Sequence, residues 1–211
     1  MKKFCFLLLL SWVVTNVTAQ NILYANLKDY LANEGDTVVA LKVEKRTKNN
    51  LLMTGGADYK ISAGADNPSL CRYLKKRCYA VRIDTCLYVN CKKLRYNKFR
   101  FGGWYAPALQ LGDKIYFSAV PLGSVAAGPD ATMDVMLGGK FGDAIAASAL
   151  IFKRVYYEID SHTGRVDFVD KEKMRLLLAG HPEWLKEYDG ENSESAKVTG
   201  KYLQKLKARA K

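Results

Sequence analysis

Hydrophobic and polar residues alternate through the middle of the chain, in residues 78–120. The segments YAVRI and CLYVNCKKL alternate on either side of Asp84-Thr85. The segments ALQL and KIYFSAV do the same around Gly112-Asp113. A period of two is typical of half-buried strands, and two turn-forming residues between such runs indicate a hairpin. We therefore predict an antiparallel meander at the centre of the fold.

Before the meander the pattern changes several times. Apolar residues at helical spacing predict a short N-terminal helix that closes at Gly35. They are Ile22, Leu23, Leu27 and Leu31. Next, TVVALKVEKRT alternates and predicts a strand, whereas residues 54–67 are rich in Gly, Ala, Asp and Ser and predict a loop. Asn67-Pro68 then predicts the start of a helix, because Asn is a good cap and Pro suits the first turn.

After the meander, small residues fill positions 121–151, and the end of this stretch, 144–151, fits a tightly packed helix. The segment VYYEIDSHTGRVDFV then predicts a second hairpin. In its turn an Asp side chain can accept backbone amides and a Gly can adopt positive φ; these residues are Asp160 and Gly164.

The C-terminal segment, residues 170–211, is predicted to be helical. Asp170 caps the run KEKMRLLLA, a short helix around Trp184 follows, and residues 193–211 form an amphipathic basic helix. Strands in the middle and helices at the end together predict an α+β fold, in which an antiparallel meander is joined by a second hairpin and C-terminal helices.

The first twenty residues, MKKFCFLLLLSWVVTNVTAQ, have the pattern of a secretory signal peptide. Lys2 and Lys3 precede an apolar run, and residues 17–19 are the small-residue pattern that a signal peptidase accepts. The apolar run is about half of the roughly 20 residues that a spanning helix needs, so we favour a cleaved signal over an anchor. We predict a signal peptide over residues 1–19 and a single domain over residues 20–211.

Four cysteines follow the predicted signal peptide. They are Cys71, Cys78, Cys86 and Cys91. In an exported chain an even number of cysteines favours disulfides, and these spacings do not match a zinc site. Across the predicted two-residue turn, Cys78 faces Cys91 at a non-hydrogen-bonded position, where Cα atoms approach to about 4.5 Å. We therefore predict a Cys78–Cys91 disulfide, with Cys71 and Cys86 either paired or free; free thiols are the alternative.

The sequence contains none of the common catalytic or nucleotide-binding signatures HExxH, GxSxG, GxxxxGK[ST] and GxGxxG. Local structure explains both histidines, since His162 lies in a predicted turn and His181 at a helix junction. Glu158 and Asp160 share the outward face of a predicted strand, which is an ordinary solvated arrangement. We therefore assign no catalytic residue, metal site or cofactor.

Cations and aromatic residues are concentrated in CKKLRYNKFRFGGWYAP, residues 91–107. The whole chain has 33 Lys and Arg against 21 Asp and Glu, a net charge of +12 that favours attraction to anions. In YNKFRF, the alternation predicts one strand with its phenylalanines inward and its cations outward, and a solvated strand face explains that alternation by itself. The density of cations also fits a surface for an anionic partner. Its candidate residues are Lys92, Arg95, Lys98, Arg100, Trp104 and Tyr105.

The order of these features resembles that of an uncharacterised family of exported proteins from Bacteroidales. The resemblance lies in the export signal, LYVNCKKLRYNKFRFGGWYAPAL with KIYFSAVPLG, RVYYEIDSHTGRV, and MRLLLAGHPEWLKEY followed by KYLQKL. It covers most of the chain after the signal. It implies a secreted or periplasmic domain of unknown function and supplies no catalytic residues.

We interpret the chain as a non-enzymatic binding module, exported to the periplasm, the periphery of the outer membrane or the exterior. The expected partner is an anionic envelope component, such as a lipid phosphate or an acidic glycan, or another envelope protein, with peripheral membrane contact at most. The alternative is a hydrolase acting on envelope polymers, which an acid pair or a histidine in a deep pocket would favour. Nucleic acid is a third candidate, because basic strands with aromatics can bind it, but export argues against such a partner.

Overall fold

The computed structural model describes most of the chain between Asn21 and Ala210. The described ranges are 21–38, 40–47, 49–51, 56–64, 66–96, 99–119, 154–191 and 195–210. The predicted signal peptide (1–19) and the helix expected at 144–151 lie outside them. In the described ranges, no helix is both long enough and apolar enough to cross a membrane.

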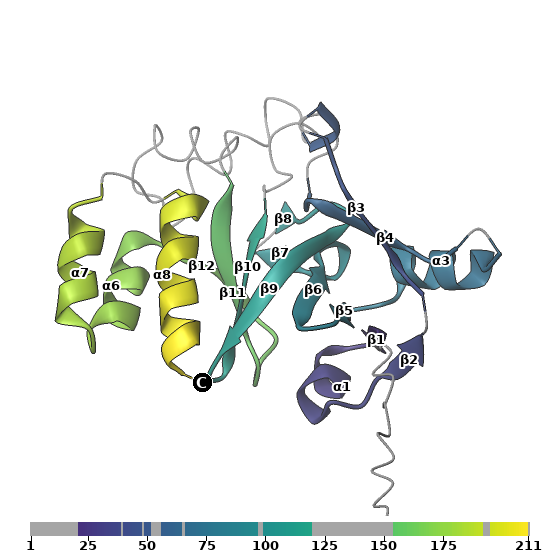
Figure 1. Cartoon of the computed structure of the whole chain (residues 1–211), viewed down its shortest axis with the longest axis horizontal. Coiled ribbons are helices and arrows are strands. Elements are labelled where there is room, and N and C mark those ends of the chain that lie inside the picture. The colour runs from purple at the N-terminus through teal and green to yellow at the C-terminus, as the bar shows by residue number, and fades with distance from the viewer. Residues whose placement is uncertain are drawn as a thin grey trace, which may run out of the picture.

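A ten-stranded antiparallel sheet forms the centre of the described structure (Figure 1). Its strands are β1 (Asn21–Tyr24), β2 (Asp36–Val38), β3 (Lys42–Lys45), β4 (Tyr59–Ser62), β5 (Ala80–Ile83), β6 (Cys86–Asn90), β9 (Tyr105–Leu111), β10 (Lys114–Ala119), β11 (Val155–Asp160) and β12 (Val166–Phe168). Eight of them follow the order β12-β11-β10-β9-β6-β5-β1-β2, while β3 pairs with β4 and β4 pairs with β9.

Helices surround this sheet, and a second sheet of two short strands accompanies it. They are α1 (Leu27–Ala32), α3 (Pro68–Lys76), α6 (Lys171–Leu178), α7 (Pro182–Asp189) and α8 (Ala196–Arg209), with the 3₁₀ turn η1 (Cys91–Lys93) and the paired strands β7 (Arg95–Tyr96) and β8 (Phe99–Arg100). In Figure 1 the C-terminal helices gather beside β11 and β12, and α3 lies at the other end of the molecule. The predicted α+β fold class is confirmed.

The turns and caps expected from local residues are confirmed. Strands β5 and β6 meet across Asp84-Thr85, where Asp84 has a φ of 52°. Strands β9 and β10 meet across Gly112-Asp113 in the same way. The side chain of Asn67 accepts from the backbone N–H of Leu70 at the start of α3, and Asp170 caps α6. Local side-chain chemistry therefore determines these boundaries.

Three local predictions are wrong. Residues 21–24 form strand β1 and not the first turn of a helix, because they pair with both β2 and β5. The run TVVALKVEKRT contains two strands, β2 and β3, and not one. Strand β4 lies inside the predicted loop 54–67, where pairing with β3 supplies backbone hydrogen bonds that composition does not indicate. In each case a partner distant in sequence decided the structure.

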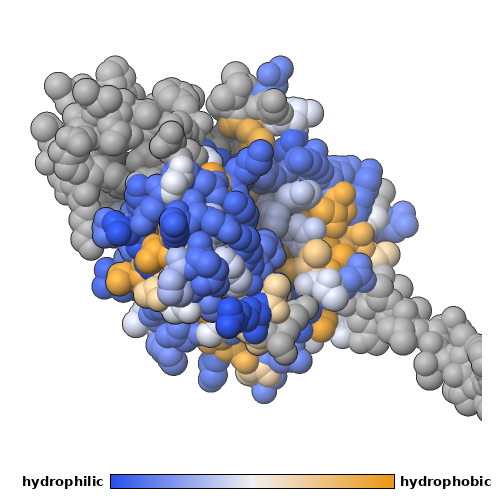
Figure 2. Space-filling model, turned by 60° about the vertical axis from the view of Figure 1, so that its left-hand side comes forward, coloured by the Kyte–Doolittle hydropathy of each residue, from blue (hydrophilic) through white to orange (hydrophobic). Residues whose placement is uncertain are grey.

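Buried side chains cover both faces of the sheet. On one face, Leu109 and Tyr116 pack with residues of α6 and α8 that include Met174 and Leu203. Elsewhere Phe117 and residues of β11 form a second cluster, and residues of α3, β4 and β5 form a third. Hydrophilic residues cover most of the described surface in Figure 2, and hydrophobic ones form limited patches.

Candidate anion-binding site

The C-terminal end of α3 is attached to the sheet through one backbone carbonyl. The oxygen of Leu74 accepts from Tyr105 Oη at 2.8 Å and from Asn90 Nδ2 at 3.1 Å. Carbonyls in the last turn of a helix lack partners within the helix, so these side chains satisfy one of them. Asn90 Oδ1 also accepts from the backbone N–H of Lys92 at 3.1 Å. Asn90 therefore links the end of α3 to η1, and it positions Lys75 of α3 and Lys92 of η1 relative to each other.

The segment FGGWY passes unusually close to Gly56. A Cβ on Gly56 would lie 2.6 Å from the carbonyl oxygen of Gly103, so a larger residue would require the backbone to move. Trp104 follows with a φ of 86°, a left-handed conformation that bulky residues rarely adopt. Its carbonyl accepts from Cys91 N at 2.9 Å, and the Arg46 guanidinium lies 5.5 Å from its ring centroid. Such strain concentrates at functional sites.

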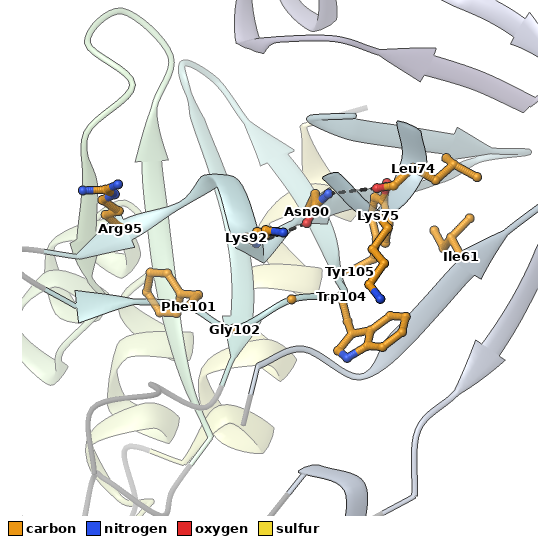
Figure 3. Close-up of a pocket in the computed structure, with 11 residues that line it drawn as sticks. Ile61, Leu74, Lys75, Asn90, Lys92, Arg95, Phe101, Gly102, Trp104 and Tyr105 are labelled. Atoms are coloured by element: carbon orange, nitrogen blue, oxygen red, sulfur yellow. Dashed lines mark hydrogen bonds between the residues drawn. The ribbon is translucent and has the colours of Figure 1, made fainter. Parts of the chain in front are cut away.

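These elements surround a cavity of about 350 Å³, which we call the indole cavity. It is lined by Ile61, Leu74, Lys75, Asn90, Lys92, Arg95, Phe101, Gly102, Gly103, Trp104 and Tyr105. Three of these residues are cations, and the described residues of the lining include no Asp, Glu, His or Cys. Figure 3 shows Lys75 and Trp104 at one end of the view and Arg95 at the other, so the positive groups are spread along the cavity.

The cations of the indole cavity are not neutralised by nearby acids. Lys75, Lys92 and Arg95 are exposed, and no carboxylate in the described ranges forms an ion pair with them. On α8, by contrast, Lys201 and Lys205 each lie 2.7 Å from a glutamate oxygen. The acids of the described chain thus form no direct ion pair with the cations of the cavity, which favours an anionic ligand there.

The structure brings some of the predicted site residues together. Lys92, Arg95 and Trp104 line the indole cavity, and Trp104 is half-buried. Tyr105 also lines it, but is only 1% exposed and its hydroxyl is committed to Leu74. Tyr105 therefore supports the cavity wall. Lys98 lies outside the described residues, and only the backbone of Arg100 is described.

The predicted single strand across YNKFRF is wrong. Tyr96 belongs to β7 and Phe99 to β8. These two strands pair with each other in the antiparallel sense, which places Arg95 opposite Arg100. Phe101 points inward as expected, since it is 2% exposed and its ring lies 5.5 Å from that of Phe117. Sequence reasoning also missed Lys75 and Asn90 as site residues. The cation-rich run 72–77 was a signal that this region is basic. The sequence does not show which of these cations lines the cavity, whereas in the structure it is Lys75.

All four cysteines in the described chain are free thiols, so the predicted Cys78–Cys91 disulfide is not formed. The predicted register is correct, because Ala80 faces Val89 and the backbone N–H of Asn90 bonds to the carbonyl of Tyr79. The ladder ends there, however, and Cys91 begins the turn η1. Cys78 and Cys91 are then buried in different core clusters, which separates the two sulfurs.

The thiols are expected to differ strongly in reactivity. Burial raises the pKa of the Cys78 thiol to about 11 and also raises that of Cys91, whereas Cys86 is exposed. At about pH 8, we expect iodoacetamide to alkylate Cys86 more than about a hundredfold faster than Cys78 or Cys91, because the thiolate is the nucleophile. Mass spectrometry of time points measures the rates, with urea-unfolded protein as the control. Equal rates in the folded protein, or a Cys78–Cys91 peptide, would contradict this burial.

An antiparallel sheet with helices at its end and a cation-lined cavity defines the chain as an α+β protein with a candidate binding site. The chain belongs to a family of unknown function, DUF6563, which matches residues 22–210. No curated protein and no solved structure gives a significant match. The family match confirms the expected membership of an uncharacterised family. A source in Bacteroidales and export from the cell are still predictions.

Proposed function

We propose that this protein is an exported, non-enzymatic binding module whose indole cavity takes an acidic saccharide of the cell envelope. The observation that carries the proposal is the cavity itself, in which three exposed cations without acidic partners lie along a wall that contains Trp104. A carboxylate or phosphate group forms strong charge-assisted hydrogen bonds with Lys and Arg. The indole adds a flat apolar surface on which a sugar ring can rest.

The cavity favours this function over the alternatives. Hydrolysis needs a positioned acid, base or nucleophile, and no carboxylate, imidazole or thiol is found among the described lining residues. A bilayer would require exposed apolar groups beside the cations. The large hydrophobic residues that are exposed in the described chain, Leu31 and Leu176, lie on α1 and α6 and do not line the cavity. Single-stranded nucleic acid needs several accessible aromatics, whereas Phe101 and Tyr105 are buried.

Neutralising the indole cavity is expected to weaken binding of an acidic glycan. We expect the protein to bind polygalacturonate, with an affinity that falls as salt is added. The double variant Lys75→Ala, Lys92→Ala should bind about tenfold or more weakly, because each lost cation removes a charge-assisted contact. Calorimetric titration across a salt series measures the effect. Circular dichroism checks folding, which exposed substitutions should change little.

The matched control is Lys76→Ala, Lys197→Ala, which removes the same charge from two exposed helical positions that do not line the cavity. It should retain most of the affinity. Methyl-esterified polygalacturonate, which has the same sugar backbone without the charge, should bind weakly. Equal losses in both double variants would assign the attraction to net charge alone. Tight binding to phosphatidylglycerol vesicles without binding to the glycan would assign the cations to a lipid surface.

A further inference from the structure

A second cavity of about 400 Å³, which we call the turn cavity, is lined by residues distant in sequence. They are Leu27, Tyr79, Lys93, Leu94, Arg95, Gly164, Arg165 and Val166. As in the indole cavity, the residues that the structure describes along this wall include three cations and no Asp, Glu, His or Cys. Lys93, Arg95 and Arg165 are exposed, and none of them forms an ion pair with a carboxylate in the described part of the chain.

The hairpin between β11 and β12 positions Arg165 at this cavity. Asp160 Oδ1 accepts from the backbone N–H groups of His162 and Thr163, at 2.9 and 2.8 Å. Gly164 then adopts a φ of 68°, a left-handed conformation that suits glycine. The carboxylate of Asp160 is itself paired with Lys114. This acid is therefore committed to the turn and to Lys114, and it leaves the charge of Arg165 available at the cavity.

The segment that carries Lys92, Lys93 and Arg95 contributes residues to both cavities. Lys92 lines the indole cavity, Lys93 lines the turn cavity, and Arg95 lines both. Figure 3 shows Arg95 at the opposite end of the view from Trp104. A ligand that begins against Trp104 and reaches Arg95 therefore arrives at the next group of cations.

We propose that the two cavities are consecutive subsites for one acidic oligosaccharide, with Arg95 contacting the ligand between them. This inference rests on the proposed function and specifies the ligand further, as a chain that carries at least two anionic groups. A ligand that occupies both subsites gains from their high effective concentration once it is long enough to span them. Shorter ligands bind at one subsite only.

The test is a titration of the protein with galacturonate oligomers of increasing length. We expect the affinity to increase stepwise, by about tenfold or more, at the length that spans both cavities. In the variant Lys93→Ala, Arg165→Ala this step should disappear, while binding of the short oligomers at the indole cavity is unchanged. In Lys75→Ala, Lys92→Ala, short and long oligomers should both weaken. Arg95→Ala should weaken the long oligomers most, because Arg95 lines both cavities.

The charge-conserving variant Lys93→Arg, Arg165→Lys should keep the step, and thermal unfolding compares the stability of all variants. An affinity that does not depend on length beyond one or two sugars would overturn the two-subsite inference and leave the proposed function intact. The same conclusion would follow if Lys93→Ala, Arg165→Ala weakened short and long oligomers equally. Absence of any binding to the oligomers would instead reject the proposed function.

Discussion

Replacing Gly56 by alanine is expected to lower the free energy of unfolding by about 3 kcal/mol and to weaken binding at the indole cavity. Two effects add. Gly56 has a φ of 84°, which costs an L-residue about 1–2 kcal/mol. Its new Cβ would also lie 2.6 Å from the carbonyl oxygen of Gly103, a contact that forces the backbone apart at a typical cost of about 1–3 kcal/mol. Because Gly103 lines the cavity, the displacement should change its shape.

Two glycines provide matched controls for this prediction. Gly112 has a similar φ of 56° but open space around its Cβ position, so Gly112→Ala should cost only about 1 kcal/mol. Gly103 has no heavy atom within 4 Å of its Cβ position, and Gly103→Ala should be nearly neutral. Urea unfolding followed by circular dichroism measures all three. If Gly56→Ala lowers the free energy of unfolding no more than Gly112→Ala does, the close approach of Gly56 to Gly103 does not restrict the side chain at position 56.

The parts of the fold that follow from the sequence are those that neighbouring residues determine. The two tight hairpins and the caps Asn67 and Asp170 depend on side chains within four positions of the boundary. Strand β1 could not be predicted in this way. The spacing of Ile22 and Leu23 suits a helix, and only pairing with β5, nearly sixty residues later, makes the segment extended.

The same distinction applies to the candidate site. Composition alone pointed to the segment around Lys92 and Arg95, because cations there greatly outnumber acids. It could not show that Lys75 and Arg165 line the same two cavities, since α3 and the β11–β12 turn approach this segment only in the folded chain. The disulfide prediction failed for a related reason. The hairpin register was correct, but where the ladder ended depended on η1 and β9.

Asn90→Ala is also expected to lower the free energy of unfolding by about 3 kcal/mol, as much as Gly56→Ala. Asn90 is 1% exposed, and its amide donates to the carbonyls of Leu74 and Cys78 at 3.1 and 2.9 Å. Its Oδ1 also accepts from Lys92 N. The variant removes these bonds from the Cys78 carbonyl and the Lys92 N–H, whereas the Leu74 carbonyl keeps its bond from Tyr105. The cost is about 1–3 kcal/mol for each buried group that loses its only partner. The end of α3 and the turn η1 both depend on this side chain, so anion binding should weaken as well.

Tyr105→Phe is the matched control, because it removes the second donor to the same Leu74 carbonyl and keeps the aromatic ring. It should cost about 1 kcal/mol, since Asn90 still satisfies that oxygen. In the double variant the Leu74 carbonyl loses both of these donors, and we expect a loss of stability that exceeds the sum of the single losses by at least about 0.5 kcal/mol. Equilibrium unfolding of the wild type and the three variants completes this cycle. Strictly additive losses would show that the two side chains act independently, and that the shared carbonyl is not the link between α3 and the sheet.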